Sequence, residues 1–195
     1  MNFFKQLHIH NRFFTYIAIL SGVFLLSYWI PVLLAVAWFL TITFSTIALI
    51  DVLLLFRFKN GITANRVVPK KFSNSDENTI AITLNNNYPF KIQTITIDEL
   101  PIQFQKRDFK HQKHLEKHTK DTFDYTVIPF ERGEYHFGNL NVYVATQLSF
   151  FSRRFTFDAN KMVAVYPSYV QMKKYEFLAI SNKLNTVGLK KIRRI

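Results

Sequence analysis

A stretch of 38 residues without a charged side chain, from Phe13 to Ile50, constrains this chain more than any other feature of its sequence. Only Pro31 interrupts it. About 20 consecutive apolar residues are enough to span the hydrocarbon core of a bilayer, so this stretch is long enough to cross twice. We therefore predict two transmembrane helices, at residues 13–30 and 32–56.

A secretory signal peptide and a buried helix pair both fit this stretch less well than a membrane anchor does. A signal peptide has an apolar core of about 7 to 15 residues followed by a cleavage site with small residues. Here the first segment is longer and continues through Trp29 and Ile30 into a second apolar segment. A buried helix pair of a soluble protein would need a polar face toward solvent, and neither segment has one. A membrane anchor is therefore the favoured interpretation.

Basic residues flank the outer ends of the stretch. Lys5 and Arg12 lie in residues 1–12, and Arg57 and Lys59 follow the second segment. The positive-inside rule then predicts that both ends lie in the cytoplasm. Asp51 is the single acid near a predicted span, and an acid at membrane depth is by default a candidate functional residue. Because Asp51 is close in sequence to Arg57, we expect its carboxylate to reach the aqueous interface instead.

The charge balance points to an acidic partner. The net charge is +12, of which residues 57–195 carry +11. Such an excess attracts nucleic acid or anionic lipid. For a domain held beside a membrane, lipid is the nearer partner, so we expect contact with the bilayer and not with nucleic acid. The chain has no cysteine, which excludes disulfides, thiol catalysis and cysteine metal sites.

After the apolar stretch, hydrophobic and polar residues alternate, as is typical of half-buried strands. Alternation is clearest at residues 79–84, 123–127, 140–144 and 155–157. Turn-forming residues such as Gly133 and Gly138 separate these segments. About seven to nine such strands predict an all-β antiparallel sandwich of the immunoglobulin-like class, which we place at residues 61–168.

The histidines are the first candidates for a metal or catalytic site. His111, His114 and His118 would share one face of a helix and could then ligate a metal. They stand among lysines between two strand patterns, so a solvated strand edge or β-hairpin explains them better. His136 has no Ser, Cys or acid at a recognisable motif spacing, and no phosphate-loop, dinucleotide or zinc-protease motif is present. We expect no enzyme activity, cofactor, metal or small-molecule substrate.

Two short polar segments, residues 98–101 and 129–138, are more distinctive than the histidines. Gly133 permits a turn that other residues would strain, Arg132 and Glu134 can pair across it, and Tyr135 can re-enter the core. A structural role is favoured over a binding role. The residues that we single out as a structural or interaction motif are Asp98, Glu99, Pro101, Arg132, Gly133, Glu134, Tyr135, Gly138, Tyr166 and Pro167.

Five segments, which include these two, carry a family resemblance. In order they read RVVPKKFSNSDENTIAITLNNNYPF, IDELP, YTVIPFERGEYHFGNLNVYV, FFSRRF and VAVYPS. They resemble the N-terminal half of bacterial membrane proteins of the "domain of unknown function 58" family, with a composition similar to members from Bacteroidetes. Each motif is weak alone, but their order after paired apolar segments is specific and covers nearly the whole chain. The chain departs from the family at residues 147–151, where a Pro-Leu-Gly-Leu-like segment is common.

The resemblance implies a non-enzymatic module for protein interaction or assembly at the bacterial inner membrane. Its implied partners are a MoxR-type AAA+ ATPase and proteins with von Willebrand A domains. Such proteins typically continue into a domain similar to von Willebrand factor type A. We therefore expect residues 169–195 to be the truncated start of a further domain, with a short helix and a basic tail. In that tail, anionic lipid would attract Lys190, Lys191, Arg193 and Arg194, each by about 1 kcal/mol.

The main alternative belongs to a different class of function. It is a basic peripheral module that binds anionic lipid or nucleic acid through its positive charge.

Overall fold

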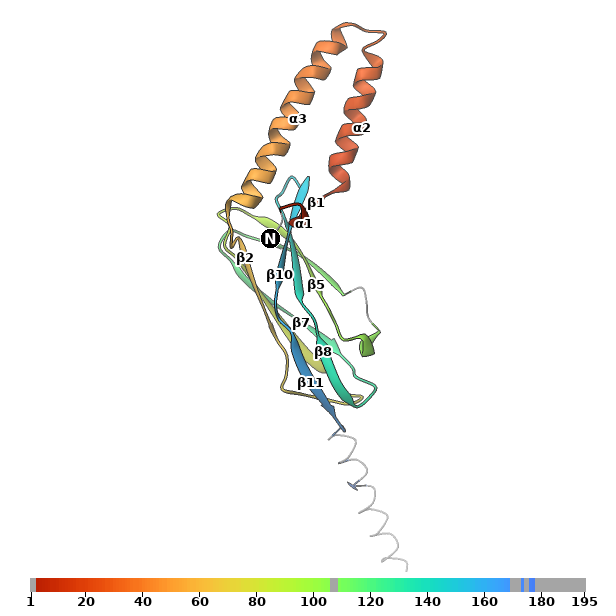
Figure 1. Ribbon diagram of the computed structural model, residues 1–195, viewed down its shortest axis with the longest axis vertical. Coiled ribbons are helices and arrows are strands. Elements are labelled where there is room, and N and C mark those ends of the chain that lie inside the picture. Colours follow the sequence, from red (N-terminus) through yellow and green to blue (C-terminus); the bar gives the residue numbers. More distant parts are fainter. Residues whose placement is uncertain (1–2, 106–108, 169–172, 174–175, 178–195) are drawn as a thin grey trace, which may run out of the picture.

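The computed structural model of the protein describes residues 3–105, 109–168, 173, 176 and 177. Two helices, α2 (Asn11–Leu26) and α3 (Val32–Arg57), lie side by side at one end of an elongated molecule, and the strands lie below them (Figure 1). A short helix, α1 (Phe3–Gln6), precedes them. The predicted combination of helices with mainly antiparallel β-structure is confirmed at this level.

The two long helices differ in length. In the described part of the chain, α3 is the one helix that is long and apolar enough to cross a membrane. It has 26 residues, which correspond to about 39 Å at 1.5 Å per residue. Helix α2 has 16 residues, or about 24 Å, which is shorter than a typical span of about 20 residues. The crossing predicted at residues 13–30 therefore stays a prediction.

The strands of the described residues form three sheets. Their bounds are β1 (Leu7–Ile9), β2 (Ile62–Val67), β3 (Lys71–Ser73), β4 (Asn78–Asn86), β5 (Ile92–Asp98), β6 (Lys110–Leu115), β7 (Lys120–Val127), β8 (Gly133–Phe137), β9 (Leu140–Ala145), β10 (Phe151–Phe157) and β11 (Lys161–Tyr166). The sheets have the orders β1-β10-β9-β5-β6, β3-β11-β8 and β2-β4-β7. All neighbours pair antiparallel except β3 and β11, which are parallel.

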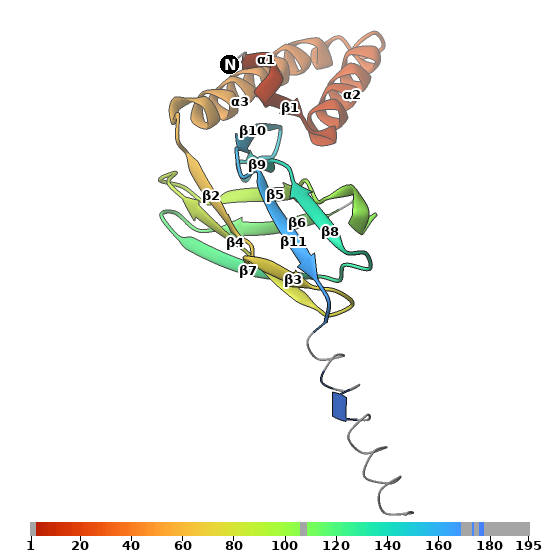
Figure 2. The ribbon, with the colours of Figure 1, turned by 60° about the horizontal axis from the view of Figure 1, so that its bottom comes forward.

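The alternating sequence pattern becomes the inner and outer faces of this sandwich. Strand β4 buries Ile80, Ile82 and Leu84, with the intervening side chains less buried. Two hydrophobic clusters result. The one nearer the helices includes Leu55 of α3, and the other, at the far end, contains Phe72 and the buried side chains of β8 and β11. Figure 2 shows these layers from a second direction.

Residues before the helices belong to the sandwich, although the predicted domain begins only at residue 61. Strand β1 pairs with β10, with Ile9 opposite Phe151. Because β1 precedes α2 and β2 follows α3, the helix pair is joined to the sandwich at both ends. A three-residue strand carries too little periodicity to be recognised in a sequence. Its pairing partner lies more than 140 positions away, as with Ile9 and Phe151.

The C-terminal predictions mostly fall outside the described residues. Of the predicted helix and tail at residues 169–195, the structure describes only Lys173, Glu176 and Phe177. The basic tail, with Lys190, Lys191, Arg193 and Arg194, lies outside the described part of the chain.

Candidate functional site

Asp51 of α3 is fully buried where the helix meets the sandwich. Its carboxylate accepts a hydrogen bond from the hydroxyl of Thr146, in the loop before β10, and another from the backbone N–H of Phe151 at 3.3 Å. The expectation that Asp51 reaches the aqueous interface is wrong, because the sandwich covers it and supplies donors. A buried carboxylate needs such donors, so Asp51 ties the base of α3 to β10.

Arg153 of β10 binds the C-terminal end of α3. Its Nη1 donates to the carbonyl oxygens of Leu55 at 3.0 Å and Phe58 at 2.8 Å. The last carbonyls of a helix lack partners within the helix, and a cation there also interacts favourably with the helix dipole. The guanidinium lies over the rings of Phe56 and Phe155, at 4.8 and 4.5 Å from their centroids. Arg153 was not among the site residues predicted from the sequence.

Tyr88 completes this junction from the turn between β4 and β5. Its hydroxyl donates to the carbonyl oxygen of Leu55 at 2.9 Å, and burial raises the pKa of Tyr88 to about 12. Gly61 lies against its ring: a Cβ at that position would be 2.0 Å from a ring carbon of Tyr88. Glycine is therefore required there for steric reasons. We call these contacts of α3 with Thr146, Arg153 and Tyr88 the junction.

A groove of about 1160 Å³ borders β8 at His136. Its walls come from the end of β5, the 3₁₀ turn η1 (Ile102–Phe104) and the loop before β8. Ile102 is 88% exposed and Phe130 is 76% exposed on these walls. We call this feature the β8 groove. It brings together residues 98–101 with parts of residues 129–138, the two polar segments that were predicted as motifs.

Asp98 lies buried beneath the β8 groove and forms an ion pair with Arg66 of β2. Tyr125 donates its hydroxyl hydrogen to Asp98 at 2.5 Å, and Arg66 also donates to the carbonyl oxygens of Gly138 and Ala159 at 3.1 and 2.5 Å. Burial raises the pKa of Asp98, and the positive Arg66 opposes that rise. Burial, with the neighbouring Asp98, also raises the pKa of Tyr125.

The sequence carries a signal for this ion pair. Arg66 shares the core-facing side of β2 with Ile62, four residues before it. Asp98 similarly ends the buried face of β5. A charge on the apolar face of a predicted strand needs a buried partner of opposite sign.

Glu99 joins β5 to the turn between β8 and β9. Its carboxylate accepts hydrogen bonds from the backbone N–H of Asn139 at 2.9 Å and from Nδ2 of Asn141 at 2.7 Å. Its carbonyl oxygen accepts from the N–H of Gly138 at 2.9 Å. A Cβ at Gly138 would lie 2.9 Å from the Cβ of Glu99, so this close approach requires glycine. Pro101, which is buried, immediately precedes η1.

The segment from Arg132 to Tyr135 leads into β8 beside the groove. Gly133 has a φ of +142°, which favours glycine. Tyr135 is 1% exposed, as expected for a side chain that re-enters the core, and its hydroxyl donates to the carbonyl oxygen of Glu131 at 3.0 Å. The expected Arg132–Glu134 pair is not formed. Glu134 instead contacts His136 along β8.

That contact joins two exposed side chains. Oε2 of Glu134 lies 3.7 Å from Nε2 of His136, because residues two apart on a strand share a face. The remaining motif residues do not line the groove. Tyr166 ends β11 next to the start of β8, and Pro167 follows it. Lys71 Nζ lies 4.7 Å from the ring centroid of Tyr166.

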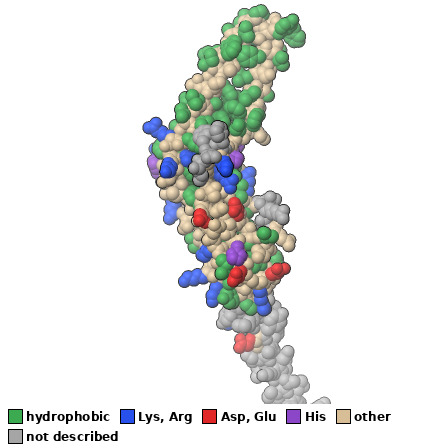
Figure 3. All heavy atoms as spheres, in the orientation of Figure 1, with side chains coloured by type: hydrophobic (Ala, Val, Ile, Leu, Met, Phe, Trp, Pro, Cys, Tyr) green, Lys and Arg blue, Asp and Glu red, His purple; other side chains and the backbone are tan. Residues whose placement is uncertain are grey.

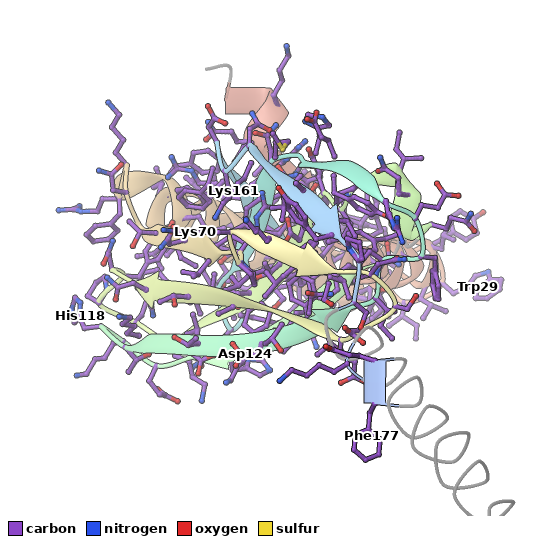
Figure 4. The ribbon with its side chains drawn as sticks, turned by 90° about the horizontal axis from the view of Figure 1, so that it is seen from below. Trp29, Lys70, His118, Asp124, Lys161 and Phe177 are labelled. Atoms are coloured by element: carbon purple, nitrogen blue, oxygen red, sulfur yellow. The ribbon has the colours of Figure 1, made fainter. Side chains whose placement is uncertain are left out.

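The histidine cluster lies on a strand edge, one of the two placements that the sequence favoured. His111 and His114 are on β6, the edge of the five-stranded sheet, and His118 projects outward from the following turn (Figure 4). His111 stacks on Phe123 at 3.7 Å between centroids. Burial, followed by the charge of Lys113, lowers the pKa of His111. Within the described ranges, no three potential ligands gather into a metal site.

Comparisons with known proteins give only distant likenesses in structure. No family model matches the chain, and no curated protein matches it. A PapD-like domain of human CEP192 is 11% identical with a TM-score of 0.40, over 56% of this chain and 87% of that domain. The CARDB domain of PF1109 from Pyrococcus furiosus is 11% identical with a TM-score of 0.36, over 54% and 94%. TM-scores of this size add nothing to the assignment of function.

Proposed function

We propose that this protein is a membrane-anchored, non-catalytic module that presents a protein-binding surface at the cytoplasmic face of the bacterial inner membrane. The junction is the observation that best supports the proposal. A helix that served only as a tether would need no buried contacts with the domain it carries. Here Asp51 and Leu55 of α3 are both fully buried against the sandwich, so the anchor holds the domain in a defined orientation.

Side-chain distribution is consistent with this arrangement. Hydrophobic side chains cover the helices, and Lys and Arg side chains lie over the sandwich (Figure 3). Most side chains of α2 and α3 are exposed, although they are apolar. An exposed apolar surface of this extent marks contact with lipid or protein, and the length of α3 fits lipid.

The β8 groove supports an interaction role more than a catalytic one. Two of the acids that line it are already bonded within the protein, Asp98 to Arg66 and Glu99 to Asn139 and Asn141. Neither is left to act as a general base. Exposed Ile102 and Phe130 beside polar groups are typical of a surface that is covered by a partner.

The chain lends itself to a direct test of topology because it contains no cysteine. Tyr28→Cys places a thiol in the turn between the helices, and Glu77→Cys places one in the exposed turn between β3 and β4. A membrane-impermeant maleimide applied to intact cells should label only the first, and applied to inverted vesicles only the second. Labelling of both from the cytoplasmic side would show that α2 does not cross.

The resemblance to the family suggests which partner to try first. We propose a MoxR-type AAA+ ATPase, with proteins that carry von Willebrand A domains as further partners. Purified ATPase should bind the full chain in nanodiscs and not empty nanodiscs. An affinity that is equal in both would reject this partner without bearing on the topology.

A second candidate function is contact with anionic lipid, favoured by the basic residues around the junction. Lys59 follows α3, and Lys91 and Lys117 lie in turns at the same end of the sandwich. These two turns lie close together, because Asn86 Nδ2 donates to the carbonyl oxygen of Glu116 at 2.7 Å. The full chain in nanodiscs with phosphatidylglycerol should then show slower hydrogen exchange in residues 116–119 than in neutral nanodiscs. The difference should disappear at high salt. Equal exchange in both lipids would reject this function.

A further inference from the structure

Strand β8 has a free edge that opens into the β8 groove. Within the described sheets β8 pairs only with β11. An edge strand directs the N–H and C=O groups of every second residue away from its partner. Nε2 of Gln103, from η1, donates to the carbonyl oxygen of Glu134 at 3.2 Å. Glu134 therefore directs its backbone groups into the groove, and His136, two residues later, shares that direction.

Two other edge strands, β6 and β7, carry residues that discourage further pairing. Lysines on an edge strand oppose the addition of another strand. Lys110 and Lys113 lie on β6, and Lys120 lies on β7. A second charged side chain of β7, that of Asp124, also projects outward (Figure 4). Strand β8 reads Gly-Glu-Tyr-His-Phe and contains neither lysine nor proline. Its edge is therefore open to pairing in a way that these two are not.

The walls of the groove indicate what kind of segment would fit. Ile102 and Phe130 offer exposed apolar surface. Glu99, Glu131 and Glu134 place acidic groups in or beside the groove, although the chain as a whole has a net charge of +12. A segment with both apolar and basic side chains is complementary to this combination.

We propose that the β8 groove binds an extended basic segment of a partner protein, which adds a strand to the free edge of β8. Side chains alternate between the two faces of a strand, so apolar residues would contact Ile102 and Phe130 while Lys or Arg residues lie beside Glu131 and Glu134. Main-chain hydrogen bonds supply affinity in such complexes, and alternate side chains supply specificity. The inference rests on the proposed interaction function and specifies its site. Gln103 must release Glu134, which an exposed side chain can do.

Synthetic peptides test the binding mode without altering the protein. The probe is an acetylated, amidated hexapeptide of alternating Val and Lys, and the charge control alternates Val and Glu. Two further peptides carry N-methyl groups, one at every Val and one at every Lys. Only every second N–H group of an added strand donates to the neighbouring strand. Methylation at either the Val or the Lys positions should therefore remove the hydrogen bonds to β8, and methylation at the other positions should leave them in place. Affinities are measured with the full chain in neutral nanodiscs.

We expect the Val-Lys peptide to bind and the Val-Glu peptide to bind at least tenfold more weakly. One N-methylated peptide should lose at least tenfold in affinity, and the other should stay within about threefold of the probe. Equal affinities of the two methylated peptides would overturn strand addition. So would the absence of binding by the probe at millimolar concentration.

Variants of the protein give an independent test. His136→Pro removes an N–H that faces the groove and leaves the ladder with β11 intact, since proline is tolerated on an edge strand when its nitrogen faces outward. The matched control His136→Ala keeps that N–H. We expect at least a tenfold loss of probe affinity for His136→Pro and for Glu134→Lys, and a change within about threefold for His136→Ala. If His136→Pro does not fold, the methylated peptides still decide the question.

Failure of this inference can be separated from failure of the proposed function. The purified full chain, without nanodiscs, is mixed with liposomes and tested for co-flotation. A chain that floats but does not bind the probe contradicts the groove inference alone. A chain that binds the probe but does not float contradicts the membrane anchor alone.

Discussion

The junction and the β8 groove contain similar polar side chains that are used in opposite ways. At the junction, Asp51 and Arg153 are buried and bond to Thr146 and to the last carbonyls of α3. At the groove, Glu134 and His136 are exposed and contact mainly each other. The first region uses its polar groups to hold its own structure together. The second leaves backbone and side-chain groups directed outward.

This difference follows from the cost of burying charge. A buried carboxylate or guanidinium must be paired and hydrogen-bonded, so substitutions at the junction or beneath the groove should destabilise the fold. Exposed surface positions contribute within about 0.5 kcal/mol, so residues on the groove wall can change with little effect on folding. Substitutions can therefore separate the two regions.

The largest effect is expected beneath the groove. Arg66→Ala leaves Asp98 buried without its ion-pair partner, which should lower the free energy of unfolding by about 3–5 kcal/mol. Urea denaturation of the full chain in mild detergent, followed by circular dichroism, measures the loss. The double variant Arg66→Ala with Asp98→Asn should recover part of it, because no unpaired charge remains. A loss below about 1 kcal/mol would mean that the pair behaves as a surface pair.

A smaller loss is expected at the junction. Arg153→Ala removes the donor to the carbonyl oxygens of Leu55 and Phe58, and hydrogen bonds from charged groups contribute about 1.5–3 kcal/mol. The neighbouring Arg154 is the matched control, since it bonds to Asn141 and not to α3. Hydrogen exchange should increase in residues 52–57 for Arg153→Ala and stay unchanged for Arg154→Ala. Equal exchange in both variants would remove the argument for a specific junction.

Steric fit at the junction gives the next prediction. Gly61→Ala forces a methyl group into the ring of Tyr88, and overpacking of this kind costs about 1–3 kcal/mol. Gly22 of α2 is the matched control, because a Cβ there meets no atom within 4 Å. Gly22→Ala should leave stability unchanged or raise it by up to about 1 kcal/mol through helix propensity. Comparable thermal midpoints for the two variants would contradict the tight packing of Tyr88.

The smallest effect is a pH dependence at the far end of the sandwich. Hydrogen bonds from the hydroxyls of Ser168 and Ser73 lower the pKa of Asp76 below 3.8. A lowered folded pKa stabilises the fold above the unfolded value, and this contribution is lost as pH falls through the folded pKa. Asp76→Asn should therefore lower the thermal midpoint at about pH 6 and have less effect below about pH 3. A difference that does not change with pH would contradict this assignment.

The sequence predicted the role of some site residues and missed others for a definable reason. Tyr135 was expected in the core and lies there, because alternation along one strand is a local property. The predicted Arg132–Glu134 pair was wrong, because the local sequence around Gly133 does not determine which side chains lie close together. Asp51 was misplaced because its donors, in residues 146–151, are distant in sequence.

Local patterns were sufficient to predict the apolar helices, the main strands and their inner faces. The spacing of buried side chains along an element and the residues that form turns both depend on neighbouring residues. Tertiary structure alone decided that β1 completes a sheet with β10 and that Arg66 meets Asp98. It also decided that β8 has no second strand partner in the described sheets. These features join segments far apart in the chain, and their pairing depends on the register of strands that only the packed sandwich sets.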